Sequence, residues 1–234
     1  MTELLREIAF DTETTGLDAN GGDRIIEIGC VEMINHVATE KSLRMLINPG
    51  REVSEATIRI TGLTDDILSD KPPFEDPVIV DALTDFIADS PIVAHNANFD
   101  RGFLNMELTR CGRSIYPEER WVDTLMIARK RFPGAPASLD ALCRRFDISL
   151  DSRTLHGALL DAQLLADVYL ELRGGRARRF EFDTTDQSVT SGTRQPARQR
   201  PEPLASLLSE EEEALHRGFM ATMSKKKPVW SRYG

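Results

Sequence analysis

Two carboxylates stand close together near the start of the chain. Asp11 and Glu13 lie two residues apart at the end of the short apolar run Ile8–Phe10, which favours a β-strand. Because side chains alternate along a strand, both acids are expected on one face, with Phe10 and Thr12 on the other. Such a pair could hold a divalent cation, but on its own it also fits a solvated strand end.

Two further acids head predicted helices with apolar faces. Spacings of i+3, i+4, i+7 or i+8, and i+11 place apolar residues beside each: Phe103, Leu104, Leu108 and Cys111 for Asp100, and Leu164, Leu165, Val168 and Leu172 for Asp161. A first-turn Asp can simply favour the helix dipole, but these two should point toward the core. A buried carboxylate needs a cation or hydrogen-bond donors, so convergence of these acids would make a divalent-metal site.

His156 is a candidate general base. It precedes Asp161 by five residues, and five helical steps rotate by about 140°, so the two cannot share a helix face. His156 is therefore expected in the loop before the helix. A loop histidine is often only a surface residue, but beside a metal site an imidazole can take a proton from water.

Other chemistries have little support in the sequence. It contains no G-x-S-x-G elbow, no phosphate-binding loop, no dinucleotide fingerprint and no Cys/His zinc spacing. A glycosidase needs carboxylates on opposite sides of the scissile bond, whereas Asp11 and Glu13 share one strand. Cys30, Cys111 and Cys143 are predicted to be buried thiols in a reducing compartment, and a cytoplasmic location is expected because no apolar leader or membrane span is evident.

Charge divides the chain into two parts. Of the 234 residues, 1–173 carry 18 Lys and Arg against 30 Asp and Glu, whereas 174–234 carry 11 against 8. The acidic part does not fit a protein that grips a long duplex through many phosphates. Metal ions bound among its carboxylates could still attract a strand end.

The element pattern predicts an α/β fold, a mixed sheet flanked by helices. Strands are expected at 8–10, 24–34, 41–47 and 91–94, and helices at 76–87, 99–111, 122–131, 138–146 and 157–172. After Gly174 and Gly175 the composition becomes rich in Ser, Thr, Gln, Arg and Pro. We therefore predict a domain at 1–175, a flexible linker at 176–203 and a C-terminal segment at 204–234.

The C-terminal segment contains one predicted amphipathic helix, Ser209–Met223. Ser209 and Glu212 have the spacing of a capping box. Leu215, Phe219 and Met223 repeat every four residues and form an apolar stripe. A helix of this kind on a tether has no core of its own to cover, which indicates a partner.

Four segments together resemble the DEDDh exonuclease family: FDTETTG at 10–16, HNANFD at 95–100, SLDALC at 138–143 and LHGALLDA at 155–162. The resemblance covers about residues 5–175, and the order and spacing are similar to the proofreading subunits of bacterial replicative DNA polymerases. It implies a ribonuclease-H-like fold and 3′→5′ hydrolysis that releases nucleoside 5′-monophosphates from a frayed DNA 3′ end.

The resemblance also implies roles for individual residues. Asp11, Glu13, Asp100 and Asp161 would hold two Mg²⁺ or Mn²⁺ ions, and His156 would deprotonate the attacking water.

Residues for substrate and partners follow from the same resemblance. Thr14 and Leu17 would line the pocket that receives the terminal nucleotide of single-stranded DNA, and His95 and Phe99 would flank this pocket. The C-terminal segment would bind the catalytic subunit of the polymerase. Binding to a sliding clamp stays open, because the motif of relatives begins with Gln just after the two glycines, whereas this chain reads RARRFEF at 176–182.

Two alternatives remain at this level. A DEDDh exoribonuclease acting on RNA ends would use the same five residues, and nothing in them reads a 2′-hydroxyl. A non-catalytic interaction subunit would keep the tail as its function.

Overall fold

The computed structural model describes residues 4–150, 155–175 and 209–222. The chain divides into two compact units, residues 1–182 and 183–234, and each is described by itself. The predicted linker at 176–203 lies outside the described residues. Among the described residues, no helix has the length and apolar character that crossing a membrane requires.

The first unit is built on a five-stranded mixed sheet with the order β3-β2-β1-β4-β5. Its strands are β1 (Arg6–Thr14), β2 (Ile25–Ile34), β3 (Val37–Leu46), β4 (Ile92–Ala94) and β5 (Trp121–Asp123). The first three form an antiparallel meander, whereas β4 and β5 run parallel to β1. The central strand β1 therefore has a partner on each side, and its carboxyl end is where the acids of the first motif lie.

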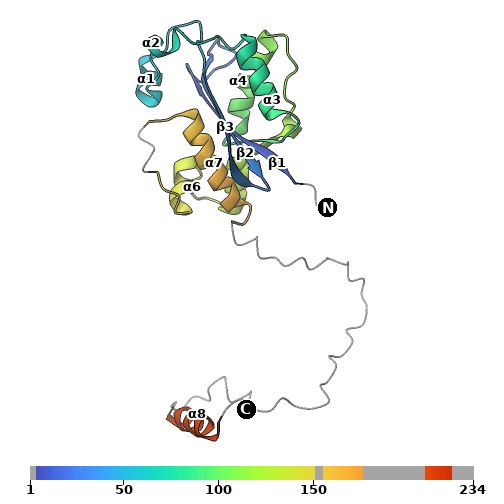
Figure 1. Ribbon diagram of the computed structural model, residues 1–234. Helices are drawn as coiled ribbons and strands as arrows, with labels where there is room; N and C mark the ends of the chain where they lie inside the picture. The colour runs from blue at the N-terminus through green and yellow to red at the C-terminus, as the bar shows by residue number, and fades with distance from the viewer. Residues whose placement is uncertain (1–3, 151–154, 176–208, 223–234) are drawn as a thin grey trace. The chain divides into compact units, whose positions relative to one another are not determined.

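Helices cover both faces of this sheet, as Figure 1 shows for α3 and α4 on one side and α6 and α7 on the other. The described helices of this unit are α1 (Glu55–Thr61), α2 (Asp65–Leu68), α3 (Pro77–Ile87), α4 (Ala97–Arg110), α5 (Thr124–Arg131), α6 (Leu139–Arg145) and α7 (Ala158–Leu172), with a short 3-10 turn at Glu118–Arg120. The predicted α/β architecture is confirmed.

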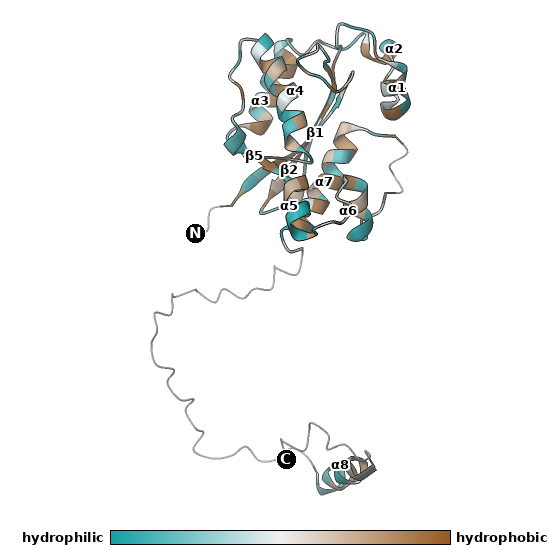
Figure 2. Cartoon of the chain, turned by 180° about the vertical axis from the view of Figure 1, so that it is seen from behind, coloured by the Kyte–Doolittle hydropathy of each residue, from teal (hydrophilic) through white to brown (hydrophobic). Residues whose placement is uncertain are grey.

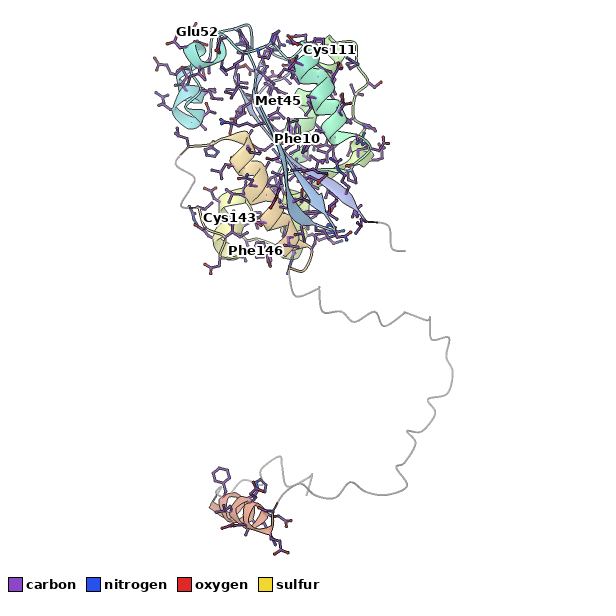
Figure 3. The ribbon with its side chains drawn as sticks, viewed as in Figure 1. Phe10, Met45, Glu52, Cys111, Cys143 and Phe146 are labelled. Atoms are coloured by element: carbon purple, nitrogen blue, oxygen red, sulfur yellow. The ribbon has the colours of Figure 1, made fainter. Side chains whose placement is uncertain are left out.

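Alternation along β1 divides the core into two clusters. Ile8 and Phe10 pack with α3 and α4, whereas Ala9, between them, packs with α6 and α7. Hydrophobic residues line the strands and the helices packed on them in Figure 2. Figure 3 labels Phe10 from the first cluster and Cys143 from the second. Since the period is two, Asp11 and Glu13 continue the face of Ala9, which is the face of α7.

Several sequence predictions need correction. The run 122–131 is not one helix, because Val122 pairs with Val93 as part of β5 and the helix α5 begins only at Thr124. The short helices α1 and α2 were not predicted, and β3 begins at Val37 rather than at residue 41. Short elements with mixed exposure show too few periods for a pattern to stand out. Cys30 and Cys143 are buried as predicted, but Cys111 is only partly buried because α4 ends there.

In the second unit, the described residues form one helix, α8 (Glu210–Thr222). The predicted capping box is present: the Glu212 N–H donates to Ser209 Oγ at 3.3 Å, and the Ser209 N–H donates to Glu212 Oε2 at 2.9 Å. The Ser209 hydroxyl also donates to Glu212 Oε2 at 2.9 Å, and the two bonds that Ser209 donates to this carboxylate lower the pKa of Glu212. Leu215 and Phe219 are 71% and 58% exposed. Met223 lies outside the described residues.

Candidate metal centre

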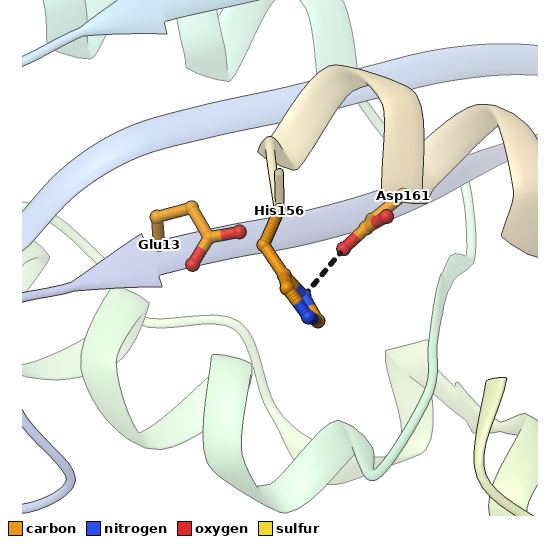
Figure 4. A group of neighbouring side chains, drawn as sticks. All are labelled: Glu13, His156 and Asp161. Carbon is orange, nitrogen blue, oxygen red and sulfur yellow. Dashed lines mark ion pairs between the residues drawn. The ribbon is translucent and has the colours of Figure 1, made fainter. Parts of the chain in front are cut away.

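The N-terminus of α7 brings three of the predicted site residues together. Ligand atoms of Glu13, His156 and Asp161 all lie within 4.8 Å of one another (Figure 4). His156 lies in the loop before α7, as predicted, and its Nδ1 is 3.3 Å from Asp161 Oδ2. The His156 N–H donates to Ile60 O at 3.0 Å, so helix α1 holds this loop from the other side.

The apolar stripe of α7 explains why Asp161 points inward. Leu164, Leu165, Val168 and Leu172 are buried against the sheet, and Asp161 on the same helix face is 4% exposed. The Asp161 carboxylate therefore lies next to β1, close to the Glu13 carboxylate. Asp11 lies two residues earlier on the strand face that Glu13 shares, opposite Gly29 of β2.

Asp100 reaches the same strand from α4. It lies in the first turn of α4, is 3% exposed, and accepts a hydrogen bond from Thr12 Oγ1 at 2.7 Å. Thr12 lies between Asp11 and Glu13 in sequence. The two acids of β1 therefore lie on the face toward α7, and Thr12 lies on the face toward α4, where it binds Asp100. Burial raises the pKa of Asp100 to about 7, although the bond from Thr12 opposes the shift.

The turn that begins α4 is braced by β5. Asn96 adopts a left-handed conformation with φ of 70°, and its N–H donates to Asp123 Oδ1 at 3.3 Å. The same Asp123 oxygen accepts from the Leu125 N–H at 2.8 Å and so caps α5. Sequence reasoning did not single out Thr12 or Asp123 for these roles. For Asp123 a signal exists, because an Asp just before Thr124 is a typical helix N-cap.

Asp100 predicts a measurable effect on the stability of the metal-free protein. Burying the charged form of this carboxylate lowers the free energy of unfolding. Because the folded-state pKa of Asp100 is raised, this loss of stability is small near pH 3.8, grows as the pH rises, and is complete above about pH 7. We expect Asp100→Asn in EDTA to melt at a higher temperature than the parent at pH 8. Since each pKa unit corresponds to about 1.4 kcal/mol, the gain should be on the order of a few kcal/mol.

The pH dependence of that gain is the check. The difference in melting temperature between Asp100→Asn and the parent should shrink as the pH falls toward 4. Asp89→Asn, at an exposed position, is the matched control and should melt like the parent at every pH. A lower melting temperature for Asp100→Asn at pH 8 would show that burial of this carboxylate carries no net cost.

The donor set fits a divalent cation. Carboxylate oxygens are the ligands that Mg²⁺ and Mn²⁺ prefer, and Glu13 and Asp161 supply them beside an imidazole. Burial disfavours the charged form of Asp100, as its raised pKa indicates. A nearby cation would favour that charged form. Glu13 and Asp161 are thus suited to hold metal, with His156 beside them.

The predicted substrate residues have varied environments. Leu17 is 86% exposed, which excludes a core role for it. The Thr14 side chain is buried and its hydroxyl donates to Gly16 O. His95 Nδ1 lies 2.9 Å from Thr124 Oγ1, and burial lowers the pKa of His95. Phe99 packs on Phe103 with ring centroids 4.9 Å apart.

Comparison with known proteins shows the family of the chain. The family model described as Exonuclease matches residues 8–169. DNA polymerase III subunit epsilon of Salmonella typhimurium is 40% identical over 96% of this chain and 96% of its own length, and that of Rickettsia felis is 47% identical over 79% and 80%. The chain belongs to the epsilon subunits of this exonuclease family.

A solved structure supports the fold. The nuclease domain of 3′hExo, a DEDDh family member bound to rAMP, superposes with a TM-score of 0.61 over 74% of this chain and 92% of that one, at 18% identity. This confirms the ribonuclease-H-like exonuclease fold. The family is dependent on divalent metals, which agrees with the acids gathered around α7 and β1.

Proposed function

We propose that the protein is the proofreading 3′→5′ exodeoxyribonuclease of a bacterial DNA polymerase III. The observation that carries this proposal is the gathering of Glu13, His156 and Asp161 within 4.8 Å at the N-terminus of α7. An exonuclease of the epsilon family with this cluster has the groups that phosphodiester hydrolysis needs. Its acidic balance suits brief contact with a strand end rather than a grip on a long duplex.

The proposed chemistry divides among the five residues. Asp11, Glu13, Asp100 and Asp161 would hold two Mg²⁺ or Mn²⁺ ions, which when bound would stabilise the attacking and leaving oxygens of the phosphodiester. His156 would accept the proton of the attacking water. Asp161 Oδ2, at 3.3 Å from Nδ1, would orient the imidazole for that transfer.

The terminal nucleotide would be held by residues near the end of β1. Exposed Leu17 would contact the last base, and Thr14 would line the pocket that Leu17 borders. Phe99 and His95, anchored on Phe103 and Thr124, would flank it. A mispaired end unstacks at lower cost than a paired one, so preference for mismatches would come mainly from fraying.

The assay that tests this function uses purified full-length protein with Mg²⁺ on single-stranded DNA. We expect nucleoside 5′-monophosphates to be released stepwise from the 3′ end, with none released in EDTA. On a primer-template, a mismatched 3′ terminus should be removed faster than a paired one.

An RNA strand of the same sequence separates the alternatives. Faster hydrolysis of RNA than of DNA would support an exoribonuclease instead. Hydrolysis of neither strand with Mg²⁺ or with Mn²⁺ would support a non-catalytic interaction subunit.

We also propose that the C-terminal segment binds the catalytic (alpha) subunit of the polymerase. Leu215 and Phe219 lie four residues apart on α8 and are both exposed. A helix of 13 residues is marginal alone in water, so it should gain stability on a partner surface. Under this proposal residues 1–175 form the exonuclease domain, residues 176–203 are a linker, and residues 204–234 bind the catalytic subunit. Clamp binding through 176–182 stays open. The role would place the protein in the cytoplasm, with the replicating chromosome.

Truncation after Gly175 is expected to separate the two functions. All five proposed catalytic residues and both large core clusters precede this point, so hydrolysis of single strands should match that of the full chain. Binding to the catalytic subunit should be lost. Co-purification and the exonuclease assay on the same preparations measure both effects.

A double substitution tests the helix within the full chain. Leu215→Ser with Phe219→Ser removes two apolar anchors, each worth about 1.5–3 kcal/mol when fully buried, so binding should weaken by at least tenfold. His216→Ser with Arg217→Ser on the same helix is the matched control. Binding that survives both the truncation and the loss of the anchors would exclude the segment as the tether.

A further inference from the structure

Helix α7 begins without a cap of its own. Its N-cap residue is Gly157, which has no side chain to accept a hydrogen bond from the first turn. The Ala158 N–H instead donates to Glu27 Oε2 at 3.3 Å, although Glu27 lies 131 residues earlier, on β2. Glu27 is only 1% exposed. A negative group at this end also complements the helix dipole, so β2 supplies the cap that α7 lacks.

Glu27 is itself held in place by β3. Arg44 Nε lies 2.6 Å from Glu27 Oε1, so one carboxylate oxygen binds Arg44 and the other accepts from Ala158. Burying a carboxylate without such partners would be costly. The chain of contacts from Arg44 through Glu27 to Ala158 thus joins β3, β2 and α7.

A glycine on the same strand allows this close approach. A Cβ at Gly29 would lie 2.1 Å from the backbone carbonyl carbon of Ala158, a separation that real contacts do not reach. In the ladder between β1 and β2, Glu27 pairs with Glu13 and Gly29 pairs with Asp11. The two residues of β2 that pair with the acids of β1 are therefore the same two residues that contact the first residue of α7.

We propose that Glu27 is a positioning residue for the hydrolytic site. By capping α7 through Ala158, it would fix Asp161 and the adjoining His156 against Glu13 without itself holding metal. This inference rests on the proposed exonuclease function. It predicts that the capping carboxylate affects the rate of hydrolysis and metal binding more than binding of the DNA strand.

The test compares Glu27→Leu with Glu27→Gln in the full chain. In metal-free Glu27→Leu, backbone amides in the first turn of α7 should exchange with solvent about tenfold faster, as expected for loss of a cap. The kcat on single-stranded DNA should fall roughly tenfold, and more Mn²⁺ should be needed for half-maximal activity, whereas the KM for DNA should change less than about twofold. Glu27→Gln keeps an acceptor oxygen and should recover most of both effects.

Glu32→Leu is the matched control. Glu32 is a buried carboxylate on the same strand, and within the described part of the chain it binds Arg6 Nε at 2.7 Å, Thr39 and Lys41 rather than α7. Its loss should lower the melting temperature but leave α7 exchange and the Mn²⁺ requirement unchanged. If Glu27→Leu does not fold, Glu27→Asp replaces it, since it keeps the charge but is one methylene short of Ala158.

Parent-like exchange in α7, together with a parent-like kcat and Mn²⁺ requirement, in folded Glu27→Leu, or in Glu27→Asp where it replaces Glu27→Leu, would overturn the proposal. If the parent itself hydrolyses no DNA, the proposed function fails, and the exchange measurement still decides whether Glu27 caps α7. The two failures are therefore distinguishable.

Discussion

Replacing Asp161 by alanine is expected to abolish metal-dependent hydrolysis while the protein stays folded. Bound metal ions contribute several kcal/mol to transition-state stabilisation, and each 1.4 kcal/mol is about tenfold in rate, so the loss should be roughly 10³-fold or more. Asp161 is buried beside Glu13 and His156, so its removal takes away a proposed metal ligand at the centre of the cluster. Single-turnover hydrolysis of a labelled strand at saturating Mg²⁺ measures the effect.

Stability distinguishes loss of a ligand from loss of the fold. Removing one carboxylate relieves repulsion among the gathered acids, so the melting temperature of Asp161→Ala in EDTA should equal or exceed that of the parent. Added Mn²⁺ should raise the melting temperature of the parent more than that of the variant. Asp167→Ala, on the exposed face of the same helix, is the control and should keep parent activity. Near-normal turnover of Asp161→Ala would remove this residue from the site.

Replacing His156 by alanine is expected to lower kcat by roughly 10²–10⁴, the range typical of a positioned general base. The imidazole can take a proton from water only in its neutral form. Activity of the parent should therefore rise with pH from the acid side, and this limb should be absent in the variant. The kcat measured across pH at saturating metal checks both effects.

Metal affinity separates a base from a ligand. His156 is half exposed and lies within the cluster, so an alternative is that its nitrogen binds metal. We expect Mn²⁺ to bind His156→Ala about as tightly as the parent. The control His216→Ala, on α8, should keep the rate and the pH profile of the parent. A pH profile unchanged in His156→Ala would exclude the general-base role.

Local patterns were sufficient to predict the helices that carry the site. The 3.6-residue period places Asp100 and Asp161 on apolar faces, and both carboxylates are buried as this predicts. The same period separates His156 from Asp161, and the structure confirms that His156 lies in the loop. Alternation along β1 likewise predicts that Asp11 and Glu13 share a face. Each of these features depends on residues within about three turns of one another, so a single stretch of sequence contains it.

Strand pairing could not be predicted in the same way. The three residues of β5 contain too few alternations to be recognised, and Val122 was predicted as helix because the helix α5 follows directly. The strand exists because Val122 pairs with Val93 of β4. A short strand is stabilised by its neighbours in the sheet, and these come from another part of the chain.

By itself the sequence determined which residues could do the chemistry and which helix or strand face each would occupy, because period and residue type are local properties. Only the tertiary structure decided how these elements are held together. Thr12 bonds Asp100 across 88 residues, and Glu27 caps α7 across 131. No local pattern links such partners. A buried carboxylate or a helix end needs a hydrogen-bond partner, and only the folded core decides which distant residue is close enough to provide it.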